Sequence, residues 1–174
     1  MNLTDLLSER LIAADLRATG KLAVIEELAH VITRVHDEIN PDAVARAVLD
    51  RERISSTALG HGVAIPHAKT SLVDMIVGCL GLSRDGIDFD AEDGVPTRIF
   101  FTLIAPQTST GEHLKVLARI ARLSQSDLFR EALLASDSAH AAYELIRAEE
   151  AKLDGAELAQ RAKGAEAVEG AEGA

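Results

Sequence analysis

In the first third of the chain, apolar residues recur every three or four positions. This spacing predicts an amphipathic helix over residues 21–36, with one apolar face turned toward a core. The expected buried face is formed by Leu22, Ile25, Leu28, Ala29 and Ile32. A second helix is predicted over residues 41–51, because Asn40-Pro41 supplies a capping side chain followed by proline at the first helical position.

Apolar runs in the middle of the chain predict strands. Residues 63–65 form a short run, and residues 73–82 and 98–105 are apolar almost throughout, which is typical of strands in the centre of a sheet. A further strand is expected near residues 11–13. Ser, Thr and Gly punctuate residues 55–62, which indicates a loop before the first of these runs.

Helical periodicity returns after the last strand. Helices are predicted over residues 111–124, with Thr110 as the N-cap, over about 127–135, and from about residue 138 onward. The inward face of the first is expected to carry Leu114, Leu117, Ile120 and Ala121. This order of helices and strands predicts a single α/β domain, residues 1–150, in which helices flank a mixed β-sheet.

Residues 151–174 differ in composition from the rest of the chain. They consist almost entirely of Ala, Glu, Gly, Lys and Arg, and beyond Leu153 the only large aliphatic residues are Leu158 and Val168. So few apolar side chains cannot bury enough surface to offset the entropy lost on ordering. We therefore expect a frayed helix that passes into a disordered acidic tail.

The 174 residues suffice for one domain with a core, and a formal net charge of −10 narrows the choice of partners. An acidic chain lacks the basic face of a nucleic-acid binder and is ill suited to an anionic membrane surface. The single cysteine, Cys79, excludes a disulfide framework and fits a reducing compartment. The first residues do not resemble a signal peptide and no apolar run could cross a bilayer, so we expect a cytoplasmic protein without direct membrane insertion.

Motifs of nucleotide binding and of common hydrolases are absent. The sequence contains no GxxxxGKS or GxxxxGKT, no GxGxxG that opens a helix after a strand, and no GxSxG, HExxH or CxxC. If the protein handles phosphate, ATP is therefore not the expected carrier.

His67 follows a Ser/Thr/Gly loop, a short strand and a proline, so it is both fixed and reachable. We hypothesise that a nitrogen of its ring carries reversible chemistry. Arg51 offers a planar set of donors that suits a dianion, and Ser56 and Thr57 can donate hydrogen bonds to phosphate oxygens. His113, in the first turn of a predicted helix, lies where the helix dipole favours anions.

Two stretches resemble the enzyme IIA domains of the fructose/mannitol type in the phosphotransferase system, a family that includes nitrogen-related regulatory IIA proteins. Residues 51–67, RERISSTALGHGVAIPH, resemble the active-site signature, and residues 110–114, TGEHL, are similar to the second motif. The resemblance spans about residues 3–148. It departs from the family within residues 58–62, where a glycine followed by Ile-Gly-Asn-Gly is more usual and Ala-Leu-Gly-His-Gly stands here.

The resemblance implies a phosphoryl carrier of the phosphoenolpyruvate-dependent sugar phosphotransferase system, with a mixed sheet between helices. His67 is the expected phosphoacceptor, Arg51 is expected to bind the phosphoryl group, and His113 is the expected second active-site histidine. Ser56 and Thr57 are expected to help stabilise charge on the phosphoryl oxygens. The expected partners are an HPr-like phosphocarrier as donor and a IIB component as acceptor, with no cofactor and no metal.

Two alternatives stay open. The first is a nitrogen-related regulatory IIA protein, in which the phosphorylation state of His67 controls the binding of protein partners. The second is a metal-binding protein with zinc held by His61, His67 and His113 and by water as the fourth ligand. The positive charge of Arg51 disfavours a cation there, and we expect His61 to point to solvent.

Overall fold

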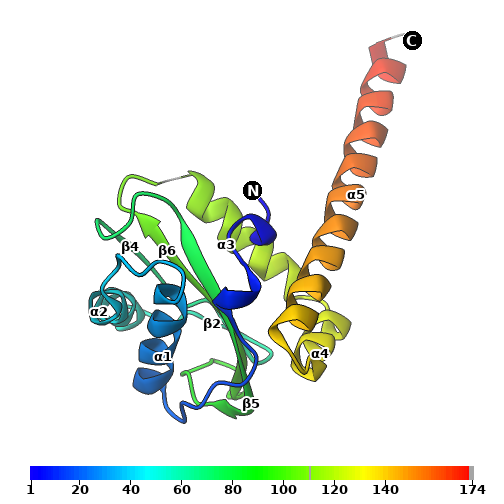
Figure 1. Cartoon of the computed structure of the whole chain (residues 1–174). Coiled ribbons are helices and arrows are strands. Elements are labelled where there is room, and N and C mark those ends of the chain that lie inside the picture. The colour runs from blue at the N-terminus through cyan, green and yellow to red at the C-terminus, as the bar shows by residue number, and fades with distance from the viewer. Residues whose placement is uncertain (110, 173–174) are drawn as a thin grey trace.

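The computed structural model describes residues 1–109 and 111–172, which contain a six-stranded mixed sheet (Figure 1). Its strands are β1 (Ile12–Ala13), β2 (Ala58–Gly60), β3 (Val63–Ala64), β4 (His67–Thr70), β5 (Val77–Ile87) and β6 (Thr97–Pro106). The strand order is β1-β5-β6-β3-β2, and β4 pairs with β6. Because β6 is antiparallel to β5 but parallel to β3 and β4, the sheet is mixed, as predicted.

Helices cover both faces of this sheet. They are α1 (Lys21–Thr33), α2 (Pro41–Glu52), α3 (Gly111–Leu123), α4 (Asp127–Ala135) and α5 (Ala139–Glu172), with short 3-10 turns at η1 (Leu3–Asp5) and η2 (Glu9–Leu11). Figure 1 shows α1 and α2 on one side of the sheet, and α3, α4 and the start of α5 on the other. No helix in the described part of the chain is both long and apolar enough to span a membrane.

Helix α2 begins as the sequence predicts. The Asn40 side chain accepts a hydrogen bond from the Ala43 backbone N–H at 3.0 Å, and Pro41 follows at the first helical position. Arg51 and Glu52 therefore stand in the last turn, at the end of α2 that leads into the loop before β2. Helix α2 also packs on β4, which places this last turn near His67.

The buried faces of two helices differ from the prediction. Leu22 is 56% exposed and Leu114 is 64% exposed, although both were assigned to the core. In α3 the buried positions are His113, Val116, Ile120 and Leu123. The sequence offers two neighbouring periodic stripes on this helix, and packing against the sheet selects the one that carries His113 inward.

Strand β4 was not predicted, and its presence corrects the expectation that His67 lies at a strand exit. The chain re-enters the sheet directly after Pro66, whose carbonyl accepts a hydrogen bond from the Leu103 N–H at 3.0 Å. His67 then pairs with Leu103, and Thr70 pairs with Pro106, parallel to β6. His67 is thus the first residue of a strand, and the residues after it are as well fixed as those before it.

Helix α5 runs from Ala139 through Glu172, so it continues past Leu153, beyond which the helix was expected to fray. Its first part is anchored by the buried Glu150, which accepts hydrogen bonds from the Leu3 N–H and the Arg119 Nε, both at 2.6 Å. Alanine, glutamate, lysine and arginine make up most of the tail and are strong helix formers, whereas its glycines, such as Gly155, disfavour a helix. Residues 173–174 and the predicted N-cap Thr110 lie outside the described residues, and the division into a domain and a tail stays a prediction.

That division predicts that the end of α5 adds little to stability. Most side chains over residues 155–161 are exposed. A chain that ends at Gln160 should keep its free energy of unfolding in urea to within about 0.5 kcal/mol of the full chain. A loss of more than about 1 kcal/mol would place the end of the folded domain later in α5.

Candidate active site

The ring of His67 is oriented by a hydrogen bond within its own segment. Its Nδ1 lies 2.6 Å from the carbonyl oxygen of Ile65. A carbonyl oxygen can only accept, so Nδ1 carries the ring proton and the lone pair lies on Nε2. Pairing of His67 and of the Pro66 carbonyl with β6 fixes this short segment. The result is a nucleophilic nitrogen on a rigid support.

The surroundings of His67 keep this nitrogen unprotonated. Burial lowers the pKa of His67 below its ordinary value of 6.5, and the positive charge of Arg51 lowers it too. The hydrogen bond to Ile65 and the negative charge of Glu52 raise the pKa without cancelling the shift. At neutral pH the ring is therefore uncharged and Nε2 is free to attack an electrophile.

His113 lies against His67, with ring centroids 5.4 Å apart and planes tilted by 50°. It occupies the inward face of α3 and is only 4% exposed. Burial, together with the charges of His67 and Lys69, lowers the pKa of His113 to about 4. Its buried Nδ1 has no hydrogen-bond partner among the described residues. At neutral pH His113 is thus an uncharged ring that can act on a ligand through Nε2.

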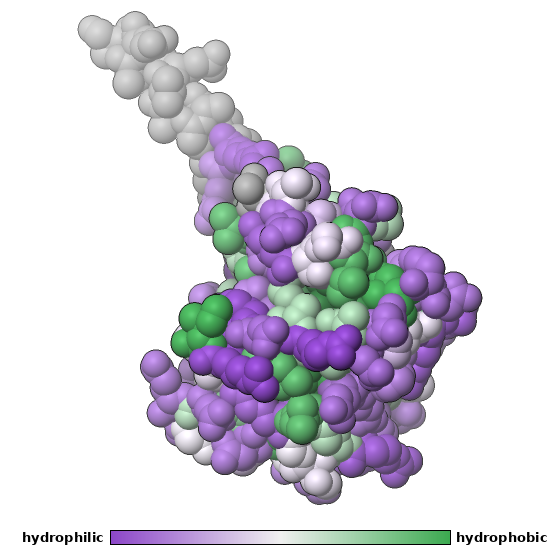
Figure 2. All heavy atoms as spheres, turned by 90° about the vertical axis from the view of Figure 1, so that its left-hand side faces the viewer, coloured by the Kyte–Doolittle hydropathy of each residue, from purple (hydrophilic) through white to green (hydrophobic). Residues whose placement is uncertain are grey.

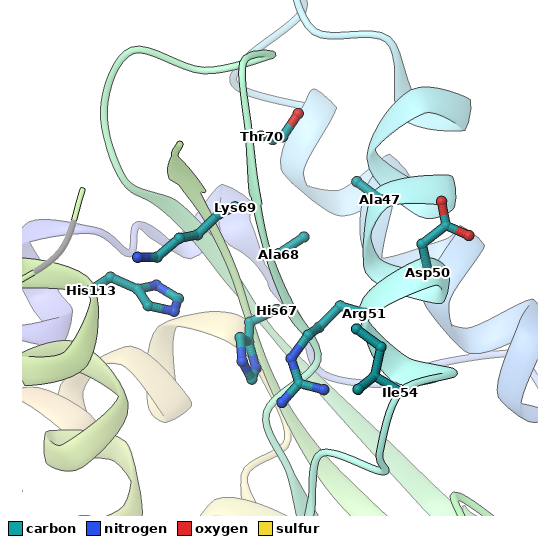
Figure 3. A pocket seen from close by; sticks show the side chains of 9 residues that line it. All are labelled: Ala47, Asp50, Arg51, Ile54, His67, Ala68, Lys69, Thr70 and His113. Carbon is teal, nitrogen blue, oxygen red and sulfur yellow. The ribbon is translucent and has the colours of Figure 1, made fainter. Parts of the chain in front are cut away.

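A pocket of about 560 Å³ opens beside the two histidines (Figure 3). Its lining comes from α2, the loop that follows α2, β4 and α3: Ala47, Asp50, Arg51, Ile54, His67, Ala68, Lys69, Thr70 and His113. Figure 3 shows the Arg51 guanidinium on one side of the His67 ring and His113 on the other. One guanidinium nitrogen of Arg51 donates to the Ser55 carbonyl at 3.1 Å, which steadies the side chain there.

The charges of this pocket favour an anion. Its one carboxylate, Asp50, forms an ion pair with Arg53 at 3.0 Å, on the exposed surface of α2. Arg51 and Lys69 form no ion pair with any described residue. In a chain with a net charge of −10, two unpaired cations in one pocket create a local positive field that attracts an anionic group.

Ser56 and Thr57 do not line this pocket; they line a second groove, together with His67 and residues of α3. The Ser56 hydroxyl donates to the Phe89 carbonyl at 2.9 Å, and the Thr57 hydroxyl donates to Glu52 at 2.5 Å. Both hydroxyl protons are therefore used within the protein. The phosphate contact predicted for these two residues stays a prediction. In the structure, their hydroxyl groups hold the loop after α2 in place.

Comparison with known proteins assigns the chain to a family. Over residues 5–149 the chain matches the family described as the phosphoenolpyruvate-dependent sugar phosphotransferase system, EIIA 2. The chain belongs to this family. The matched region of this EIIA chain contains Arg51, His67 and His113.

Its relatives include transport and regulatory proteins. A nitrogen regulatory protein from Bradyrhizobium diazoefficiens is 37% identical over 146 residues, which cover 84% of this chain and 95% of the relative. The fructose-specific EIIABC component of Bacillus subtilis is 34% identical over 84% of this chain, which spans only 23% of that longer protein. The solved structure of the nitrogen regulatory protein IIA-Ntr from Neisseria meningitidis is similar with a TM-score of 0.78 at 31% identity, over 83% of this chain and 98% of that one.

The sequence predicted no role for Glu52, the last residue of α2, whose carboxylate holds the loop that follows. Glu52 is 5% exposed and accepts hydrogen bonds from the Thr57 N–H at 3.0 and 3.2 Å as well as from the Thr57 hydroxyl. Lys21 neutralises it at 2.9 Å. Glu52 thus ties the end of α2, which carries Arg51, to the loop beside His67. In the sequence, the only indication of a role for Glu52 is its position directly after Arg51.

His61 does not join the two other histidines. It is exposed, adopts a left-handed conformation (φ 53°), and its backbone N–H donates to Asp93 at 2.7 Å. Ala58 keeps a negative φ, so the alanine in place of the usual glycine causes no strain. Within the described residues, no three His, Cys, Asp or Glu side chains lie close enough to hold a metal ion. Among the described residues, His61, His67 and His113 therefore do not come together as the zinc alternative requires.

Proposed function

We propose that this EIIA chain is a cytoplasmic phosphoryl carrier of the sugar phosphotransferase system. It accepts a phosphoryl group from phosphorylated HPr on Nε2 of His67 and passes it to a IIB component. The observation that carries the proposal is the hydrogen bond from His67 Nδ1 to the Ile65 carbonyl, because it leaves a fixed, unprotonated nitrogen beside the pocket formed with Arg51.

In the proposed step, the Nε2 lone pair forms a bond to phosphorus while the bond from phosphorus to the donor's nitrogen breaks. The donor keeps that electron pair, and Nδ1 of His67 keeps its proton in the hydrogen bond to Ile65. Arg51 stabilises the charge on the phosphoryl oxygens, and the neutral His113 assists through Nε2. Such transfer depends mainly on positioning and electrostatics. Transfer to IIB returns the electron pair to Nε2.

The surface around the pocket supports a protein as donor and acceptor. Ile54, at the pocket, is 80% exposed. Figure 2 views the molecule from the side of α1 and α2 and shows hydrophobic side chains (green) among hydrophilic ones (purple) on this face. Such a mixed surface is typical of interfaces between proteins that associate reversibly.

Transfer of labelled phosphate from HPr tests the proposal. We expect the wild-type chain to acquire label that is lost in acid and retained in alkali, as a phosphorus–nitrogen bond requires. We further expect the labelled chain to pass its phosphoryl group to a IIB component. Failure to acquire label from HPr would overturn the proposed function.

The titration of the histidines gives an independent prediction. His67 must be neutral to attack, and burial lowers its pKa, so its NMR titration midpoint should fall below 6.5 and its acceptor activity should decline only on the acid side of that midpoint. His113 should titrate near pH 4. His140, whose pKa is raised by its hydrogen bond to Glu9, should titrate above 6.5 and serves as the internal control. A midpoint for His67 above that of His140 would contradict the assigned environment.

A regulatory output is the second candidate function. The observation that favours it is the similarity to a nitrogen regulatory protein of which this chain covers 95%. In that case the phosphoryl group on His67 controls which protein partners bind. Binding assays with the phosphorylated and unphosphorylated chain separate the two outputs, because a carrier transfers its label to IIB whereas a regulator changes partner without transfer.

A further inference from the structure

Strand β4 places Lys69 beside His67. Side chains alternate across a strand, so His67 and Lys69 project from the same face, while Ala68 between them is buried. Two residues along a strand span about 6.6 Å, which a lysine side chain can bridge. In Figure 3 the Lys69 side chain points toward His113, and Arg51 lies on the opposite side of the His67 ring.

The charge of Lys69 has no protein partner in the described part of the chain. The side chain is exposed, and its positive charge faces other positive or neutral groups of the pocket: Arg51 and His113. The only carboxylate of the pocket, Asp50, is held by Arg53. Positive groups gathered in this way repel one another until an anion enters.

Resting on the function proposed above, we propose that Lys69 binds the phosphoryl group carried by His67. The phosphoryl group is close to a dianion at neutral pH. Arg51 supplies one positive charge and already donates one hydrogen bond to Ser55. His113 is neutral and supplies a dipole only. Lys69 provides the second full charge, from the side of the pocket opposite Arg51.

Charge and shape at this position can be separated by substitution. Lys69→Met removes the charge and keeps a long side chain, and Lys69→Arg keeps the charge. Lys115→Met removes another exposed lysine, which lines a different pocket, and it is the matched control. Each chain is phosphorylated with HPr, or with phosphoramidate as a small donor, and the phosphoryl group is followed by ³¹P NMR across pH.

A nearby positive charge favours the dianion, so its removal should raise the pKa of the phosphoryl group. For Lys69→Met we expect a rise of about 0.5–1 pH unit and an acceptance rate from HPr that is about 5- to 10-fold lower. Lys69→Arg should restore both quantities to near the wild-type values, and Lys115→Met should change neither. A purely structural role for Lys69 would not move the phosphoryl pKa.

The outcomes distinguish this inference from the function on which it rests. A wild-type chain that acquires no label from either donor overturns both. A wild-type chain that is labelled, with Lys69→Met unchanged in phosphoryl pKa and rate, overturns only the role of Lys69. Equal effects of Lys69→Met and Lys115→Met would mean that net charge alone is responsible, and they also overturn it.

Discussion

Replacement of His67 by alanine is expected to abolish the acid-labile phosphoryl label. Removal of a nucleophile typically costs a factor of about 10³ or more in rate, because no other group occupies its position. His113 does not occupy this position, since it is held on the inward face of α3 with its ring centroid 5.4 Å from that of His67. The measurement is the label transferred from phosphorylated HPr to the variant, relative to wild type, at equal protein concentration.

His61→Asn is the matched control for this experiment. His61 is an exposed histidine six positions upstream, and asparagine tolerates the left-handed conformation that this position requires. We expect the variant to accept phosphate at the wild-type rate. Circular dichroism should show that both variants are folded. Undiminished label on folded His67→Ala would remove His67 from its assigned role, and loss of label from His61→Asn would reopen the role of His61.

The sequence predicted the helices and long strands because these elements bury many apolar side chains in a regular pattern. Strand β4 was not predicted from the sequence, because His-Ala-Lys-Thr contains only one inward apolar residue, Ala68. Its strand conformation comes from pairing with β6, more than thirty residues later. For the same reason the sequence did not predict a role for Lys69, because His67 and Lys69 share a face only if β4 is a strand.

The candidate site was predicted by residue type rather than by geometry. The sequence named Arg51, His67 and His113, and the structure brings these three together around one pocket. It also named the Ser56 and Thr57 hydroxyls as donors, but their acceptors depend on tertiary structure. The Ser56 acceptor belongs to Phe89, thirty-three positions away, which no local pattern reveals.

The tail shows the limit of an argument from burial alone. The few apolar residues after Leu153 predicted a frayed helix that passes into a disordered tail, and the structure shows α5 as a helix through Glu172. Alanine, glutamate, lysine and arginine favour a helix because their side chains lose little conformational freedom when a helix forms.

Replacement of Glu52 by alanine is expected to lower the free energy of unfolding by about 3 kcal/mol. The variant leaves the Thr57 N–H and hydroxyl without their acceptor in a buried site and removes a buried ion-pair partner of Lys21. Urea denaturation measures the loss. Asp50→Ala is the matched control on the same helix, because Asp50 pairs with Arg53 at the exposed surface, and it should cost less than about 1 kcal/mol.

Glu52→Ala should also disturb the site without touching the phosphoryl group. The loop that Glu52 holds leads from Arg51 to His67, so its release should let both side chains drift, and we expect acceptance of phosphate to slow by about tenfold. Burial and the charge of Arg51 lower the pKa of His67, and Glu52 opposes them, so the His67 midpoint should move further down in the variant. Glu52→Ala could instead lose stability but keep the wild-type rate of phosphate acceptance and the wild-type titration midpoint of His67. In that case Glu52 supports only the fold, and β4 and the last turn of α2 suffice to position Arg51 and His67.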